Sequence, residues 1–154
     1  MIDTPEVTRT TPVRTAYVHV TVPRAEIRSV MGPGIQEVYA ALAAQGIAPA
    51  GPWFTHHLRM DPAVFDFEIC VPVSTPVTPT GRVRAGEVPA TKVARAVYRG
   101  PYEGLGDAWG AFDRWIAAEG LTPRGDLWER YVAGPESGSD ATRWRTELER
   151  ALVE

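Results

Sequence analysis

The sequence predicts an α+β fold: two strand-helix-strand-strand units related by a pseudo-two-fold axis, with antiparallel sheets. Two observations predict it, namely an internal repeat with a period of 74 residues and the same order of hydrophobic patterns in each half. The chain has 154 residues, of which 44% are hydrophobic and 23% charged, as in an ordinary globular domain. Because one such unit alone has a thin core, we expect the two to form a single domain with a ligand groove between the halves.

The repeat is clearest around two glycines. Segment 45–51 (QGIAPAG) matches segment 119–125 (EGLTPRG), and an aromatic cluster follows each of them. The match sets His57 of the first copy against Tyr131 of the second. In each copy the glycine stands where a helix commonly ends.

Each half shows the patterns of one strand, one helix and two further strands. We expect strands at 13–22, 53–60, 64–73, 91–99, 127–133 and 142–148, and helices through 35–42 and 105–116. The segment between the halves is rich in proline and glycine, which predicts a linker with a short extended piece at 82–84. The predicted domain covers 1–154, with repeat one at about 13–73, the linker at 74–89 and repeat two at about 90–148.

Composition and charge exclude several classes of protein. The net charge is −3 and no basic stripe is present, so we expect no direct binding to nucleic acid. The single cysteine, Cys70, excludes a disulfide framework and a multi-cysteine zinc site, and its apolar neighbours predict an inert core residue. No apolar run is long enough to span a membrane and no signal-peptide core is present, so we expect a cytoplasmic protein.

Strand alternation identifies candidate site residues. In the strand at 127–133, Glu129 and Tyr131 point to the same face, about 7 Å apart along the strand. A carboxylate among aromatic rings is costly to bury, so it either takes up a proton or awaits a cationic or hydrogen-bonding ligand. A surface glutamate paired with an arginine is the alternative. Asp66 and Glu68 share one face of the strand at 64–73, which either meets solvent or lines the groove.

Four short motifs, in this order, carry a resemblance to a known family. They are segments 51–54 (GPWF), 67–73 (FEICVPV), 98–105 (YRGPYEGL) and 128–131 (WERY). Together they resemble the GyrI-like small-molecule-binding family, which includes the effector-binding domains of AraC- and MerR-type multidrug regulators. The resemblance spans about residues 13–148. It implies the duplicated fold and a groove that binds hydrophobic, aromatic and often cationic compounds. We expect no cofactor, and no metal site because the adjacent His56 and His57 face opposite ways on a strand.

The resemblance also implies roles for individual residues. The family's pocket glutamate, in a Glu-x-Tyr pattern, corresponds to Glu129 with Tyr131. Where the first half commonly has a tyrosine, this chain has His57, which predicts a more polar and pH-responsive pocket. We expect ligand contacts from Glu129 and His57 and from an aromatic wall formed by Trp53, Phe54, Tyr102, Trp109 and Tyr131.

Three functions are consistent with these patterns. The leading interpretation is a stand-alone sensor or sequestration module for a hydrophobic or aromatic small molecule, because only about 12 residues precede the first strand and leave no room for a DNA reader. The second is a hydrolase of cyclopropane-containing genotoxic natural products, in which Glu129 acts with Tyr131 or Glu68 as proton handlers. The third, an inhibitor that binds DNA gyrase, implies a protein partner that no residue pattern supports.

Overall fold

The computed structural model describes residues 2–154, apart from the side chains at positions 60 and 136. The chain divides into two compact units, one formed by residues 11–90 and the other by residues 2–10 and 91–154. We call them unit 2 and unit 1, respectively. This division falls close to the start that the repeat predicts for its second copy, about residue 90.

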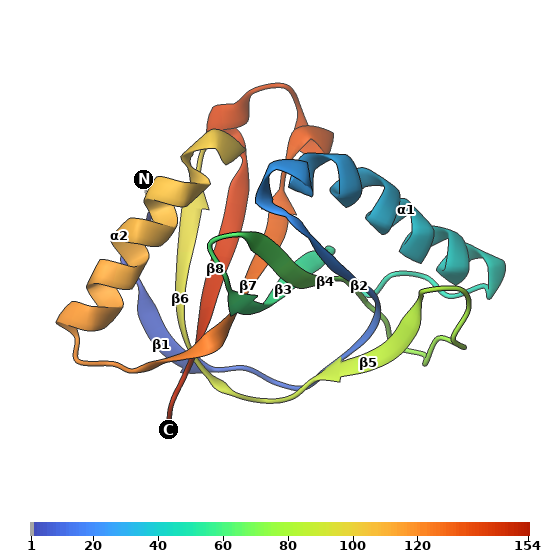
Figure 1. Ribbon diagram of the computed structural model, residues 1–154, viewed down its shortest axis with the longest axis horizontal. Helices are drawn as coiled ribbons and strands as arrows, with labels where there is room; N and C mark the ends of the chain where they lie inside the picture. The colour runs from blue at the N-terminus through green and yellow to red at the C-terminus, as the bar shows by residue number, and fades with distance from the viewer. Residues whose placement is uncertain (1) are drawn as a thin grey trace. The chain divides into compact units, whose positions relative to one another are not determined.

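Unit 2 contains one helix and four strands (Figure 1). They are β2 (Val13–Pro23), α1 (Ile27–Ala44), β3 (Phe54–Met60), β4 (Val64–Pro72) and β5 (Arg84–Val88). The strands lie in the order β3-β4-β2-β5, and every adjacent pair is antiparallel. The helix packs against β2 and β4 and closes an apolar core that includes Val18, Val38, Leu42 and Ile69.

Unit 1 repeats this arrangement (Figure 1). Its elements are β1 (Glu6–Arg9), β6 (Lys92–Arg99), α2 (Leu105–Ala118), β7 (Pro123–Ala133) and β8 (Arg145–Leu152). The strand order is β7-β8-β6-β1, again antiparallel, so each unit places its second, third and first repeat strands in that order. The buried residues Phe112, Ile116 and Leu148 form its core under α2. The α+β class and the strand-helix-strand-strand order are confirmed.

A fourth strand in each unit comes from an unexpected part of the chain. β1 precedes β2 in the sequence but pairs with β6, whereas β5 precedes β6 but pairs with β2. Each unit therefore takes its edge strand from the segment that leads into the other repeat. The linker prediction at 74–89 missed most of β5, and β1 was not predicted at all. Val77 and Val83 of the same segment are buried in the core of unit 2.

Both helices end in the same hydrogen-bonded turn. In α1 the amides of Gly46 and Ile47 donate to the carbonyls of Ala43 and Leu42, and Gly46 has a φ of 67°. The amides of Gly120 and of the leucine after it repeat these bonds at the end of α2. This is the Schellman pattern, in which a residue with positive φ, usually glycine, follows the last turn. The helix ends that the repeat predicts are therefore confirmed.

The first helix is longer than its sequence pattern indicates. The prediction covered 35–42, where apolar residues recur at helical spacing, and Gly32, Pro33 and Gly34 before it have weak helix propensity. The helix instead begins at Ile27 and continues through Pro33. Ile27, Val30 and Met31 in its first turns pack against the core of unit 2. This packing outweighs the weak helix propensity of the segment.

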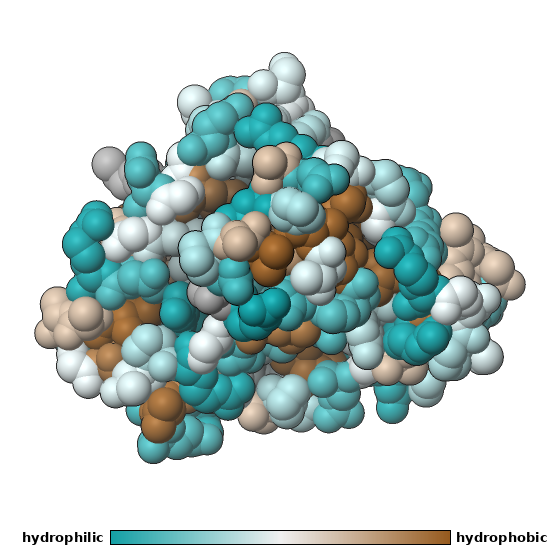
Figure 2. Space-filling view, viewed as in Figure 1, coloured by the Kyte–Doolittle hydropathy of each residue, from teal (hydrophilic) through white to brown (hydrophobic). Residues whose placement is uncertain are grey.

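Apolar residues at the edge of that core remain visible from outside. Figure 2 shows strongly hydrophobic residues, among hydrophilic ones, on the side of unit 2 where α1 and β2 lie. The partly buried residues that border this core include Val22, Ile27 and Met31.

Neither helix among the described residues is long and apolar enough to cross a membrane.

Candidate functional site

Glu129, the predicted pocket glutamate, lies on β7 in unit 1, and its side chain reaches Trp109 of α2. Trp109 Nε1 donates a hydrogen bond to Oε2 of the carboxylate over 2.7 Å, and the Tyr131 hydroxyl donates to Oε1 over 2.8 Å. Tyr131 stands two residues along the same strand, which gives the shared face that alternation predicts. Trp109 reaches down from α2. Glu129 is partly buried and bonded to two aromatic donors, which argues against the alternative of a glutamate exposed on the surface.

The surroundings of Glu129 oppose its ionisation. Burial raises the pKa of the Glu129 carboxyl above its ordinary value of 4.5, and the hydrogen bonds from Trp109 and Tyr131 lower it in part. Removal from water disfavours the charged form, whereas donors to the carboxylate favour it. A cation placed beside the carboxylate would favour the charged form further.

Three aromatic rings extend from the glutamate toward the surface. The Tyr102 ring contacts Tyr131 edge-on, with centroids 6.0 Å apart, and lies tilted against Trp144 at 5.2 Å. All three residues are partly exposed. On the other side of the carboxylate, Trp109 packs on the buried Phe112 at 5.7 Å. Rings at these separations favour binding of flat or cationic organic groups by stacking and cation–π contacts.

The loop motif at 98–105 positions Tyr102. Tyr98 lies on β6, and its hydroxyl donates to the carbonyl of Pro101 over 2.7 Å, so the ring fills the space under the loop. A Cβ atom on Gly104 would lie only 2.1 Å from the Tyr98 hydroxyl, which makes glycine necessary there. Tyr102 opens the short turn that ends at this glycine. The motif therefore holds Tyr102 over Tyr131 through close packing.

Sequence reasoning missed Trp144. It follows the glycine- and serine-containing segment 134–143, and its indole N–H donates to the carbonyl of Gly138 over 3.0 Å. Our predicted strand at 142–148 began too early, since β8 starts at Arg145. Even so, the alternation of that strand sets Trp144 on the same face as Thr146 and Leu148, and this signal was available from the sequence.

The remaining predicted aromatic residues lie in unit 2. Trp53 packs at the edge of its core, and Phe54 is fully buried. His57 stacks on Phe67, with centroids 5.1 Å apart, and meets Phe65 edge-on at 5.7 Å. Whether these residues contact ligand is not tested by the geometry of either unit, so their place in the site stays a prediction.

His57 is not a switch near neutral pH. Burial, and then the positive charges of His56 and Arg24, lower the pKa of His57 to about 4. The ring is therefore neutral at physiological pH. The strand buries His57 against phenylalanines instead of exposing it to water. A response of this histidine to pH is therefore expected near pH 4, and its part in the pocket stays a prediction.

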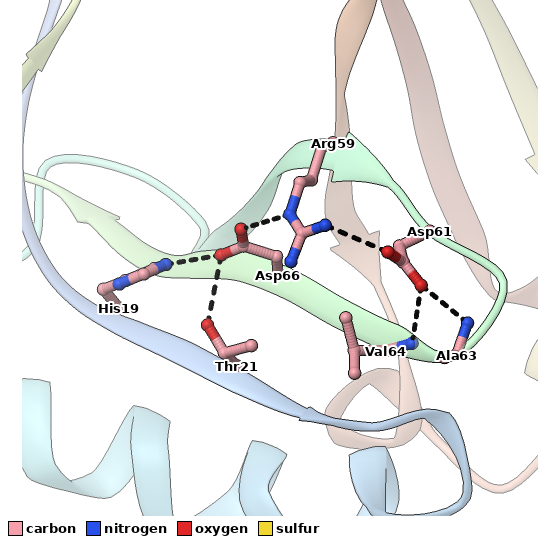
Figure 3. Close-up of polar contacts among 7 residues, drawn as sticks. All are labelled: His19, Thr21, Arg59, Asp61, Ala63, Val64 and Asp66. Carbon is pink, nitrogen blue, oxygen red and sulfur yellow. Dashed lines mark hydrogen bonds and ion pairs between the residues drawn. The ribbon is translucent and has the colours of Figure 1, made fainter.

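Glu68 lies on the polar face of the sheet in unit 2. It faces His56, with a separation of 3.4 Å between Nδ1 and Oε1. Next to it, Asp66 accepts from His19, Thr21 and Arg59 (Figure 3). Arg59 also bonds to Asp61 in this network. The assigned catalytic role of Glu68 stays a prediction.

Two further predictions concern Cys70 and metal binding. Cys70 is buried, between Tyr17 on β2 and Phe54 on β3 in the strand register, as predicted for an inert core residue. Over residues 2–154, no three side chains of histidine, cysteine, aspartate or glutamate come together as a metal site would require.

The family model of the GyrI-like small molecule binding domain matches residues 3–149. The chain belongs to this family. No curated protein matches it significantly in sequence.

Solved structures show the same fold at low sequence identity. The C-terminal domain of EcmrR superposes with a TM-score of 0.86 at 20% identity, and 98% of each chain is covered. The chain spans 57% of the EcmrR chain that was solved in complex with DNA. SAV2435 bound to tetraphenylphosphonium gives a TM-score of 0.71 at 10% identity, covering 98% of this chain and 94% of SAV2435. A hydrolase from Listeria innocua gives 0.68 at 12%, covering 97% and 91%.

Proposed function

We propose that this protein is a sensor or sequestration module that binds flat or apolar organic cations at Glu129. The observation that carries the proposal is the carboxylate itself, which is desolvated and yet fixed by a donor on each oxygen. Trp109 and Tyr131 are neutral donors that orient the carboxylate. A cation bound beside the carboxylate offsets part of the cost of its desolvation.

The aromatic rings supply the second part of recognition. Tyr102, Tyr131 and Trp144 present partly exposed ring surfaces in contact with one another. A lipophilic cation buries its hydrocarbon surface against these rings while its charge approaches Glu129. SAV2435, which shares this fold, was solved with tetraphenylphosphonium, a cation of this chemical class, and that supports the choice of ligand.

Isothermal titration with tetraphenylphosphonium tests the proposal. Glu129→Gln removes the charge but keeps both hydrogen bonds, since the amide oxygen accepts from Trp109 and the Tyr131 hydroxyl turns to accept from the amide nitrogen. We expect this variant to bind the cation more than about tenfold more weakly, a loss of about 1.4 kcal/mol or more. Binding of the neutral triphenylphosphine oxide should change by less than about twofold.

The pH dependence gives a second measure of the same contact. Because the pKa of Glu129 is raised, part of the protein carries a protonated, neutral carboxyl just above pH 4.5. A cation binds the ionised form, so its affinity should rise as the pH increases through the raised pKa, with release of a proton. Glu129→Gln should show no such rise. An equal loss of cation and neutral-ligand binding, at every pH, would contradict the proposal.

A hydrolase is the second candidate, and one observation favours it. A carboxyl with a raised pKa is suited to general acid or base catalysis, and the Tyr131 hydroxyl lies within hydrogen-bonding distance of it. The test is incubation with cyclopropane-containing alkylating compounds and mass spectrometry for the ring-opened product with water added. Catalysis requires product formation that falls about 100-fold or more in Glu129→Gln.

A further inference from the structure

Thr146 is a buried polar residue next to the site, and the mechanism of binding given above does not use it. It lies on β8, is fully buried, and pairs in register with Tyr131 of β7 on one side and Tyr98 of β6 on the other. Paired residues on adjacent strands point to the same face of a sheet. Thr146 therefore faces the same side as Glu129 and Tyr131. Within residues 2–154, its hydroxyl has no hydrogen-bond partner.

An unsatisfied hydroxyl in this position needs an explanation. A buried polar group without a partner destabilises the fold, whereas valine has the same shape and no polar atom to satisfy. The hydroxyl of Thr10 shows the usual arrangement: it accepts from the Thr91 amide and donates to the Thr91 carbonyl. The strand pair at Thr146 thus retains a polar atom where an apolar side chain would fit.

The other unit fills the corresponding position with an aromatic ring. Phe67 pairs with His57 on β3 as Thr146 pairs with Tyr131 on β7, and the Phe67 ring stacks on His57. In unit 1 the small threonine leaves Tyr131 to contact Tyr102 instead. For a ligand to reach the fully buried Thr146 hydroxyl, it has to displace the partly exposed rings of Tyr102 and Tyr131.

We propose that the Thr146 hydroxyl is a specificity-determining group of the cation site, which hydrogen-bonds a polar substituent of the ligand. This inference rests on the proposed function of Glu129. Along the strand pair, Glu129 is opposite Leu148, and Thr146 is two residues further, or roughly 7 Å. The site then selects cations that carry a hydroxyl, amine or carbonyl at about this distance over purely hydrocarbon cations of the same charge.

A matched pair of phosphonium ions tests the selectivity. (3-Hydroxypropyl)triphenylphosphonium and n-butyltriphenylphosphonium differ by one hydroxyl in place of one methyl group. We expect the wild-type protein to bind the hydroxyl compound about threefold to tenfold more tightly, the range for one hydrogen bond. Thr146→Val should abolish this preference and leave the affinity for the butyl compound unchanged, and Thr146→Ser should retain the preference. Thr15→Val, at another buried threonine, is the control and should behave like the wild type.

Thermal unfolding without ligand separates this role from a structural one. If the hydroxyl serves only the ligand, Thr146→Val should unfold at the same temperature as the wild type or higher, because no bond is lost. A lowered unfolding temperature together with unchanged selectivity overturns the proposal. Equal affinity of the wild type for both ions overturns it as well and leaves the role of Glu129 intact. Absence of binding to either ion overturns both proposals.

Discussion

The two units share one backbone plan but differ at the positions that matter for binding. Both helices end in the same turn, and the strand registers coincide, with His57 opposite Phe67 and Tyr131 opposite Thr146. The repeat period then matches three further pairs of positions: Trp109 with Ile35, Glu129 with Thr55, and Tyr131 with His57. Unit 1 holds a hydrogen-bonded carboxylate where unit 2 holds a threonine.

The two units differ in the side chains at the matched positions of the helix and of the second repeat strand. In unit 2, Ile35 belongs to the hydrophobic core, Thr55 is fully buried, and the Phe67 ring packs on a neutral histidine. In unit 1, the corresponding helix position supplies an N–H donor to Glu129. The comparison teaches that the fold does not require the buried acid. The other copy has a threonine at the matched position, and the proposed binding of a cation would explain why an acid is present in unit 1.

The largest effect is expected when the acid is moved to the other unit. Thr55→Glu places a carboxylate at the matched position of unit 2, where Ile35 cannot donate a hydrogen bond as Trp109 does. An incompletely compensated buried charge should lower the free energy of unfolding at pH 7 by about 3 kcal/mol or more. Urea denaturation measures this, with Thr55→Ser as the control. A loss below about 1 kcal/mol would show that the site around Thr55 accommodates a carboxylate about as well as the site around Glu129 does.

The next effect concerns the acid sensitivity of unit 2. The pKa of His57 is lowered to about 4 in the folded protein, against 6.5 in the unfolded chain. The unfolded state therefore binds more protons between these values, and stability is lost as the pH falls from about 6.5 to 4, by roughly 3 kcal/mol. His57→Phe should lack this loss in denaturation curves recorded over that range. His19→Gln, at a half-exposed histidine, is the control and should retain it.

The smallest effect concerns one hydrogen bond in unit 1. Trp109→Phe keeps an aromatic ring but removes the N–H that donates to Glu129. At pH 7 we expect a loss of stability of about 1–2 kcal/mol, because a buried carboxylate loses one donor. The loss should shrink at acidic pH, where the carboxyl is protonated. Trp115→Phe on the same helix is the control, and an equal, pH-independent loss in both variants would contradict the role given to Trp109.

Much of the candidate site in unit 1 could be predicted from the sequence, because it depends on the spacing of residues within one strand and one helix. Alternation along one strand placed Glu129 and Tyr131 on one face, and helical spacing placed Trp109 on the buried side of α2. Trp144 was missed because it lies between a short 3-10 turn and the start of β8, outside any regular strand or helix. The satisfaction of a buried hydroxyl, as at Thr146, depends on every neighbouring atom and has no signal in a single sequence.

The exchanged edge strands show a second limit. Strand β1 has too few residues for a clear pattern, and β5 lies in a segment that reads as a linker. Short strands gain their stability from pairing, and which strand they pair with is decided by residues distant in the sequence. The same reasoning explains α1, whose first turns form across Pro33 because they pack on the core.

The amino-acid sequence alone determined the duplicated plan, the class of fold, the helix ends at Gly46 and Gly120, and the pairing of Glu129 with Tyr131 on one face. These features rest on local periodicity, which every residue of a strand or helix carries. Tertiary structure alone decided that His57 is neutral at physiological pH, that the Trp144 ring contacts Tyr102, and that the Thr146 hydroxyl is left without a partner in residues 2–154. Burial and hydrogen bonding are properties of a three-dimensional neighbourhood, and that neighbourhood exists only once the chain has folded.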